Sequence, residues 1–305
     1  MNRRSAMRIC AIAGAVSFLP GAQPQKPFTI SSDVRLVLLD VAVKDGNGGF
    51  VTGLGKEDFV VTENGKRQTI TVFADEDLPV TVGILVDESR SMAPKRDEVL
   101  AAARILLKES NPQDEMFVLN FNDDVKRGLP ANTLFSDDLD KLSAALYRGI
   151  PKGMTAMNDA VVDGVEQLKR GTQNKKALVL ISDGGDNASY KSRSEMLDAV
   201  ERSLATIYAI GIYGNDDQDK NPQILKELAR ISGGVAYVPW QPSNVSAACR
   251  QIAREIRTRY TIGYIPPPPS SRGADIVRRI HVKVSAPGRS RLVARTRTVY
   301  RYDPI

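Results

Sequence analysis

The sequence contains few of the residues that most often carry catalysis or covalent cross-links. Its 305 residues include one histidine, His281, and two cysteines, Cys10 and Cys249. A Ser–His–Asp triad would need His281 beside a nucleophile, but His281 falls in an alternating segment typical of a β-strand. HExxH, P-loop and GxGxxG motifs are all missing. These absences argue against an enzyme.

Long apolar runs are also missing, and the nearest approach to one lies at the amino terminus. Three arginines within the first eight residues precede a mostly small or apolar, acid-free run at 9–20, and Ala22 is a small residue suited to cleavage. Residues 1–22 therefore have the layout of a secretory signal peptide, too short to span a bilayer, which takes about 20 apolar residues. We expect an exported protein, in the periplasm, in the cell envelope or secreted. An uncleaved anchor or a misplaced start is the alternative.

Cysteine usage agrees with a core-stabilised fold. Cys10 lies inside the expected signal peptide, so the mature chain retains only Cys249 and has no internal disulfide. Cys249 stands among Ala247, Ala248 and Ile252, which indicates a buried, small, apolar residue.

The formal net charge is +6, and it falls to +3 without residues 1–22. Residues 250–305 hold 13 Lys and Arg against three acids, a local charge of +10. Because many of these charges alternate with apolar residues, a solvated β-sheet face is the favoured interpretation. Contact with an anionic envelope surface or partner is the alternative. We expect no nucleic-acid partner, and the pattern leaves the oligomeric state open.

Three regions follow the signal peptide. Residues 31–76 form an N-terminal β module, with strands expected at 34–43, 50–52, 59–63 and 68–74 and a hairpin turn at Asn64-Gly65. Residues 79–258 alternate apolar strands with amphipathic helices, one of them capped by Ser136. This alternation predicts an α/β domain with a doubly wound, mostly parallel sheet.

Residues 259–305 return to a β pattern, with strands expected at 260–265, 277–285 and 292–302. Each β region has about three or four strands, which is marginal for an independent sheet. We therefore expect both to form one small β-sandwich with the α/β domain inserted between them. Two separate small sheets packed on the central domain are the alternative.

Oxygen-bearing side chains follow two of the buried strands. Asp87, Ser89 and Ser91 come directly after the apolar run 80–86, and Asp183 follows the apolar run 177–181. Thr155 lies in a loop that leads into a helix. Because ligands of such sheets bind at the carboxyl ends of the strands, these side chains are expected to converge there. Hydroxyls and carboxylates are hard oxygen ligands suited to Mg²⁺.

These residues resemble the motif of von Willebrand factor type A domains. That motif is Asp-x-Ser-x-Ser after the first strand, a Thr before a helix and an Asp after the fourth strand, and all five positions are filled here. Met154 precedes the Thr where the family often has Gly. The flanking segments 41–66, 259–264 and 283 onward resemble exported bacterial members, so the resemblance covers nearly all of the mature chain.

The resemblance implies a metal-ion-dependent adhesion site. Ser89, Ser91 and Thr155 would bind the ion through their hydroxyls, and Asp87 and Asp183 would bind it directly or through water. The ion is usually Mg²⁺, with Mn²⁺ as the alternative, and an Asp or Glu carboxylate of a protein partner would complete its coordination.

Two rival functions stay open. The protein could be a metal-assisted hydrolase, or the ion could be purely structural and only hold the loops together. Several other acids could form a second cation site, but solvated loop acids are the more ordinary interpretation. These acids are Asp123, Asp124, Asp216, Asp217 and Asp219.

Overall fold

The computed structural model describes residues 36–214, 219–238, 244–268 and 277–302. The expected signal peptide, 1–22, and two of the loop acids, Asp216 and Asp217, lie outside the described residues. None of the described helices is long and apolar enough to cross a membrane.

A six-stranded sheet in the order β10-β9-β8-β5-β6-β7 carries the candidate site. All neighbouring strands run parallel except β6 and β7, which are antiparallel. Every residue of β5 is buried, as expected for an apolar strand covered on both faces. The strands are β5 (Val80–Asp87), β6 (Glu115–Phe121), β7 (Val125–Arg127), β8 (Lys175–Ser182), β9 (Thr206–Gly211) and β10 (Ala236–Tyr237).

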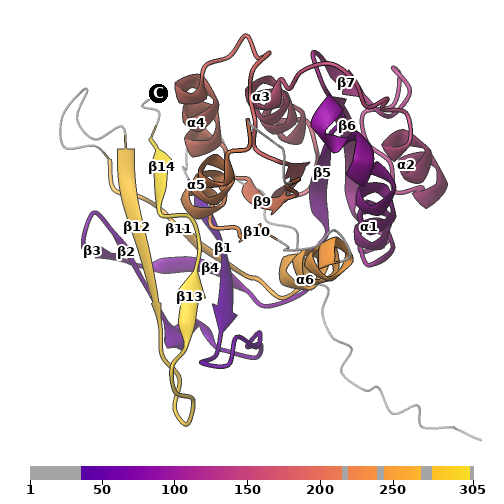
Figure 1. Ribbon diagram of the computed structural model, residues 1–305. Helices are drawn as coiled ribbons and strands as arrows, with labels where there is room; N and C mark the ends of the chain where they lie inside the picture. Colours follow the sequence, from indigo (N-terminus) through magenta and orange to yellow (C-terminus); the bar gives the residue numbers. More distant parts are fainter. Residues whose placement is uncertain (1–35, 215–218, 239–243, 269–276, 303–305) are drawn as a thin grey trace, which may run out of the picture. The chain divides into compact units, whose positions relative to one another are not determined.

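Two groups of helices cover this sheet (Figure 1). In one group α1 packs on α2 and on α6, and in the other α4 packs on α3 and on α5. The first group is α1 (Arg96–Lys108), α2 (Leu139–Leu146) and α6 (Val245–Arg257), and the second is α3 (Met157–Lys169), α4 (Arg193–Arg202) and α5 (Pro222–Ser232). Short 3-10 helices span Lys56–Asp58 and Arg90–Lys95.

The expected cap of α2 was misplaced. Asp138, rather than Ser136, is the cap, and its carboxylate accepts hydrogen bonds from the backbone of Asp140 and Lys141 at 3.0 and 3.2 Å. Ser136 instead forms a β-bridge with Met116, which extends the chain before the helix begins. A carboxylate also suits the positive end of a helix better than a hydroxyl does.

The remaining strands form two antiparallel four-stranded sheets, β13-β1-β11-β4 and β14-β12-β2-β3. Each sheet takes two strands from before the central sheet and two from after it, and their inward side chains share one hydrophobic core. The predicted fold class, an α/β domain inserted between β segments that come together, is therefore confirmed. The strands are β1 (Val37–Lys44), β2 (Phe59–Glu63), β3 (Lys66–Gln68), β4 (Ile70–Ala74), β11 (Tyr260–Tyr264), β12 (Val277–Val284), β13 (Val293–Arg295) and β14 (Val299–Arg301).

Two expected strands are each divided between these sheets. The segment 68–74 breaks between β3 and β4, and the segment 292–302 breaks between β13 and β14. The hairpin at Asn64-Gly65 is as expected, with left-handed φ angles of 48° and 77° that join β2 to β3.

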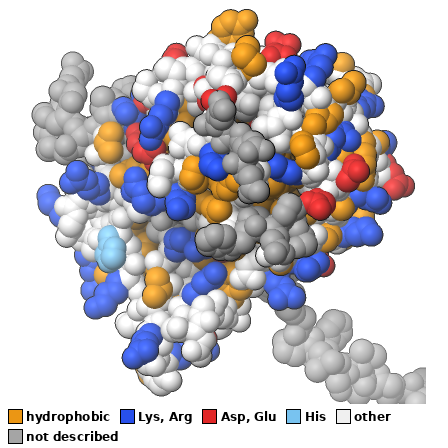
Figure 2. All heavy atoms as spheres, in the orientation of Figure 1, with side chains coloured by type: hydrophobic (Ala, Val, Ile, Leu, Met, Phe, Trp, Pro, Cys, Tyr) orange, Lys and Arg blue, Asp and Glu red, His pale blue; other side chains and the backbone are white. Residues whose placement is uncertain are grey.

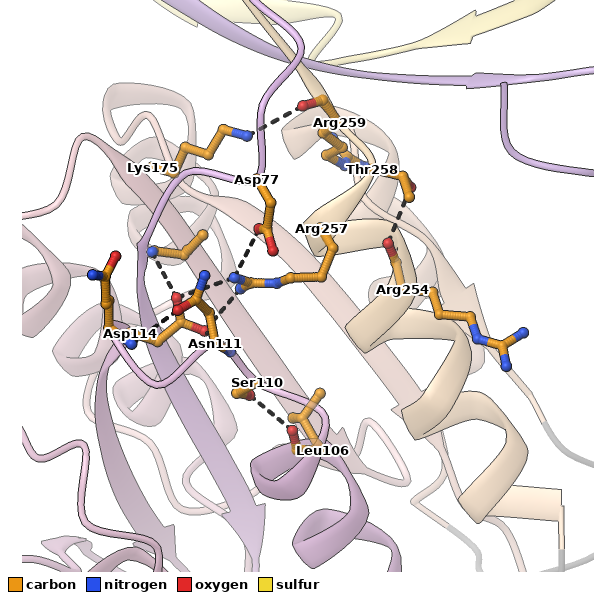
Figure 3. A network of polar contacts seen from close by, with 12 residues as sticks. Asp77, Leu106, Ser110, Asn111, Asp114, Lys175, Arg254, Arg257, Thr258 and Arg259 are labelled. Carbon is orange, nitrogen blue, oxygen red and sulfur yellow. Dashed lines mark hydrogen bonds and ion pairs between the residues drawn. The ribbon is translucent and has the colours of Figure 1, made fainter. Parts of the chain in front are cut away.

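A polar network fixes both chain crossings between the central sheet and the flanking sheets (Figure 3). Arg257, at the end of α6, pairs with Asp77 at 3.0 Å and with Asp114 at 2.8 Å. Lys175 donates a hydrogen bond to the carbonyl of Arg259 at 3.2 Å. Because Asp114 and Lys175 lie at the starts of β6 and β8, the network sits at the amino edge of the sheet. The opposite, carboxyl edge stays available for the site.

Candidate metal centre

Asp87 ends β5 and is almost completely buried. Its carboxylate accepts hydrogen bonds from the backbone of Ser89 at 2.9 Å and from the hydroxyl of Ser182 at 2.6 Å. The parallel register of β5 and β8 brings these two strand ends together, with Val86 opposite Ile181. Ser182 was not among the predicted site residues, although its place beside Asp183 at the end of β8 was visible in the sequence.

Four of the five predicted residues converge at this edge. The hydroxyls of Ser89 and Ser91 lie 3.1 Å apart, and Ser91 donates a hydrogen bond to Asp183 at 2.7 Å. The second oxygen of Asp183 accepts the backbone N–H of Gly185 at 2.9 Å. Asp87 joins the set through its bond to the backbone of Ser89.

Gly184 provides the tight turn that follows Asp183. Its φ of 81° lies in the left-handed region, and a Cβ there would lie 2.4 Å from the carbonyl oxygen of Asn221. Only glycine fits both conditions without strain. Residue 184 therefore has to be glycine for the chain to turn directly after Asp183.

Thr155, the fifth predicted residue, lies on the adjoining loop and is mostly buried. Its backbone N–H donates to the side chain of Asn187 at 2.8 Å, and the backbone of Arg90 donates to Gly153 at 3.3 Å. These bonds place the loop against the turn that carries Ser89 and Ser91. Within the described part of the chain the Thr155 hydroxyl forms no hydrogen bond, so its oxygen is available to a ligand.

The electrostatics of the edge favour a cation. Burial raises the pKa of Asp87 to about 7, hydrogen bonds from Ser182 and Ser89 oppose that shift, and the charge of Asp183 adds to it. Neither aspartate forms an ion pair with a Lys or Arg among the described residues. The carboxylates of Asp87 and Asp183 and the hydroxyls of Ser89 and Ser91 form a hard-oxygen donor set, with Thr155 on the adjoining loop. The residues present therefore fit a divalent cation such as Mg²⁺.

An ion pair between Glu88 and Arg96 lies beside the site. Glu88 follows Asp87 and points to Arg96, with 2.9 Å between its carboxylate and the guanidinium. Arg96 also donates to the carbonyls of Tyr147 and Gly149 at 3.3 and 2.7 Å, while Lys152 donates its backbone N–H to Glu88 at 2.9 Å. We call Glu88 and Arg96 the loop clamp, because they attach the loop that leads to Thr155 to the end of β5. Burial raises the pKa of Glu88, and Arg96 opposes that rise.

Tyr213 is a second neighbour that the sequence did not single out. Burial, together with the charge of Asp183, raises the pKa of its hydroxyl to about 12. That hydroxyl is buried without a hydrogen-bond partner in the described residues. Tyr213 follows β9, the next strand after β8 in the sheet, so it closes one side of the site.

The other candidate residues take structural or remote positions. Asp123 accepts the backbone N–H of Met154 at 2.8 Å, and Asp219 accepts the side chain of Asn187 at 2.9 Å. In the described ranges no group of three or more His, Cys, Asp or Glu could hold a second ion. His281 lies on β12, far along the chain in a flanking sheet, and Cys249 is buried in α6.

Comparisons with known proteins identify the family of the central domain. The model of the von Willebrand factor type A domain matches residues 81–246, more than half of the chain. The chain belongs to this family. Comparison with curated protein sequences gives no match.

Solved structures share the fold at low sequence identity. A von Willebrand factor type A protein from Catenulispora acidiphila is 14% identical, with 89% of this chain and 74% of that chain covered and a TM-score of 0.52. A mutant of the PilB minor pilin from Streptococcus sanguinis is 13% identical, covers 61% and 63%, and has a TM-score of 0.50. Proximal thread matrix protein 1 from the mussel byssus is 18% identical over 59% of this chain, with a TM-score of 0.49. The match spans 49% of that mussel protein, about half its length.

Proposed function

We propose that this protein is a metal-ion-dependent protein-binding module that captures an acidic side chain of a partner. Asp87, Ser89, Ser91, Thr155 and Asp183 would hold Mg²⁺, or Mn²⁺ in its place. The observation that carries the proposal is the continuous contact from Ser89 through Ser91 to Asp183, directly beside Asp87, at the carboxyl edge of the sheet. Membership of the von Willebrand factor type A family supports it.

The charges of the donor set suit capture of a carboxylate. Two aspartates offset a divalent ion, and three hydroxyls are neutral, so the bound ion would supply a Lewis acid that accepts one more anionic oxygen. An Asp or Glu of a partner protein is the ligand that fits this feature.

Binding without catalysis is the form of this function that we propose. The carboxylate of Glu88, next to Asp87 in the chain, pairs with Arg96, and the only histidine of the chain lies in a flanking sheet. Neither of these groups is therefore the water-activating base that a hydrolase would need. The amino-terminal segment 1–22 supports a location in the envelope or outside the cell.

A binding assay against the envelope fraction of the source organism tests the proposal. The purified protein is used as bait with Mg²⁺, with EDTA, and as the Ser89→Ala/Ser91→Ala variant. The matched control, Ser110→Ala/Ser285→Ala, also removes two hydroxyls, but it does so at the amino edge and directly after β12. We expect capture by the wild type and the control in Mg²⁺ only. Capture that persists in EDTA and in Ser89→Ala/Ser91→Ala would refute a metal-dependent binding module.

The two rival functions give different results in the same preparation. A structural ion would raise the melting temperature while leaving partner capture unchanged on chelation. A metal-assisted hydrolase would turn over ester or phosphate substrates and lose that turnover in Asp183→Ala. Our proposal expects metal-dependent capture and no turnover.

A further inference from the structure

The strand β12 presents a row of basic side chains to solvent. Its residues alternate strictly between exposed and buried, so Arg279, His281 and Lys283 share the outer face with Val277. The buried positions Ile280, Val282 and Val284 belong to the core of the flanking sheets. Alternate residues on one strand are about 7 Å apart, so the three polar side chains form a line about 14 Å long.

Strand pairing adds a fourth basic side chain to this line. His281 lies opposite Thr62 of β2, and Thr62 lies opposite Arg67 of β3. Arg67 is exposed, and it shares the outer face because residues paired across strands point the same way. We call Arg67, Arg279, His281 and Lys283 the basic face. Figure 2 shows the histidine on this side of the molecule with Lys and Arg side chains gathered around it.

Five other cations after residue 250 form ion pairs, whereas the exposed Arg254, Arg289 and Arg291 form none among the described residues. Arg67, Arg279 and Lys283 form no ion pair within the described ranges, and the β2 positions that separate them are Val60 and Thr62. The neutralised cations are Arg257 with Asp77 and Asp114, Arg259 and Arg295 with Glu255, Arg278 with Glu63, and Arg301 with Asp198 and Glu201.

An arrangement of this kind has an electrostatic cost. Like charges on neighbouring strand positions repel each other, and mixed signs would solvate the sheet equally well. Five arginines after residue 250 pair with acids, whereas the outward positions of β12, β2 and β3 around the basic face carry no acid. A row of exposed cations beside the valine side chains of Val60 and Val277 matches an anionic surface that carries apolar material beneath its charges.

We propose that the basic face binds the anionic phospholipid surface of a membrane. This activity is separate from the metal centre, since it uses a different sheet and no metal ligand. The proposed membrane contact would hold the protein at the lipid surface while its carboxyl edge engages a protein partner.

Co-sedimentation of the purified chain with lipid vesicles tests this proposal. Vesicles of phosphatidylcholine mixed with phosphatidylglycerol are compared with phosphatidylcholine alone, both in EDTA, so that the metal centre takes no part. We expect binding to the anionic vesicles only, with a loss at high salt because screening weakens contacts between exposed charges. Each cation near an anionic surface strengthens binding by about fivefold, so Arg67→Gln/Arg279→Gln/Lys283→Gln should bind about a hundredfold more weakly.

A control of equal net charge makes the result specific to the face. Arg104→Gln/Lys108→Gln/Lys226→Gln also removes three exposed cations, but from α1 and α5, and it should bind like the wild type. Circular dichroism melting confirms that both variants are folded. Equal losses in the two variants, no binding to anionic vesicles, or binding only to a soluble polyanion such as polyphosphate would each overturn the proposal.

Discussion

Replacing Arg96 by methionine should destabilise the fold and loosen the metal centre together. Arg96 has 20% of its side chain exposed, whereas the Glu88 side chain is only 2% exposed. The substitution removes the counter-charge of a buried carboxylate and two hydrogen bonds to the loop carbonyls of Tyr147 and Gly149. Methionine keeps most of the apolar length of arginine, so packing changes little.

The expected magnitude follows from the burial of the pair. Removal of one partner from a buried ion pair costs about 3–5 kcal/mol, because the other charge stays buried and unpaired. The partial exposure of Arg96 places this pair at the lower end, so we expect Arg96→Met to lower the free energy of unfolding by about 3 kcal/mol. Glu88→Gln in the same background removes the unpaired charge and should restore about 1 kcal/mol or more.

The wild type, Arg96→Met, Glu88→Gln and the double variant are unfolded with urea in a double-mutant cycle, which measures these free energies of unfolding. EDTA is present to exclude any metal contribution. The same proteins are titrated with Mg²⁺, and Arg96→Met should bind more weakly because the loop that leads to Thr155 is released. If Arg96→Met lowers the free energy of unfolding by less than about 1 kcal/mol, and the cycle gives no coupling energy with Glu88, the pair behaves as an exposed ion pair. That result would refute the loop clamp.

Three further predictions concern other parts of the chain. Burial raises the pKa of Cys249 to about 12, so the thiol stays neutral through pH 9. A thiol reagent should therefore label it only after denaturation, and rapid labelling of the native protein would contradict its burial. Gly184→Ala should cost more than about 1 kcal/mol in urea unfolding, from the left-handed φ and the contact with Asn221; a neutral result would refute the tight turn. Asp114→Ala should lower the free energy of unfolding by about 3 kcal/mol, because it leaves Arg257 without its better-buried partner. A gradual loss of cooperativity, instead of a shifted midpoint of the urea transition, would argue against this junction.

The parts of the site that the sequence predicted are those set by strand geometry. The apolar runs that became β5 and β8 indicated parallel strands buried on both faces, and parallel strands end at one edge. That rule alone brings Asp87 near Asp183. The residue types that follow each strand then indicated a hard cation.

The supporting residues could not be predicted because their partners are set by three-dimensional contacts. Glu88 follows Asp87 in the sequence, but its pairing with Arg96 depends on the turn between β5 and α1. Ser182 looked like an ordinary strand end until the register placed it against Asp87. Tyr213 gains its place only from the order of β9 beside β8.

Alternation likewise could not assign strands to sheets. The segment 68–74 was expected to be one strand, yet it divides between two sheets at Thr69. Arg278 and Arg279 are neighbours, but one is buried against Glu63 and the other faces solvent. A count of charges along the sequence therefore overstated how much of the basic region is exposed.

Titration calorimetry of the metal-free protein with Mg²⁺, repeated with Mn²⁺, tests the central claim most directly. The wild type and the Ser110→Ala/Ser285→Ala control should each bind one ion saturably. Ser89→Ala/Ser91→Ala and Asp183→Ala should lose that binding while keeping a cooperative unfolding transition. Absence of saturable binding in the wild type, or unchanged binding in Ser89→Ala/Ser91→Ala, would contradict a metal centre built from these five residues.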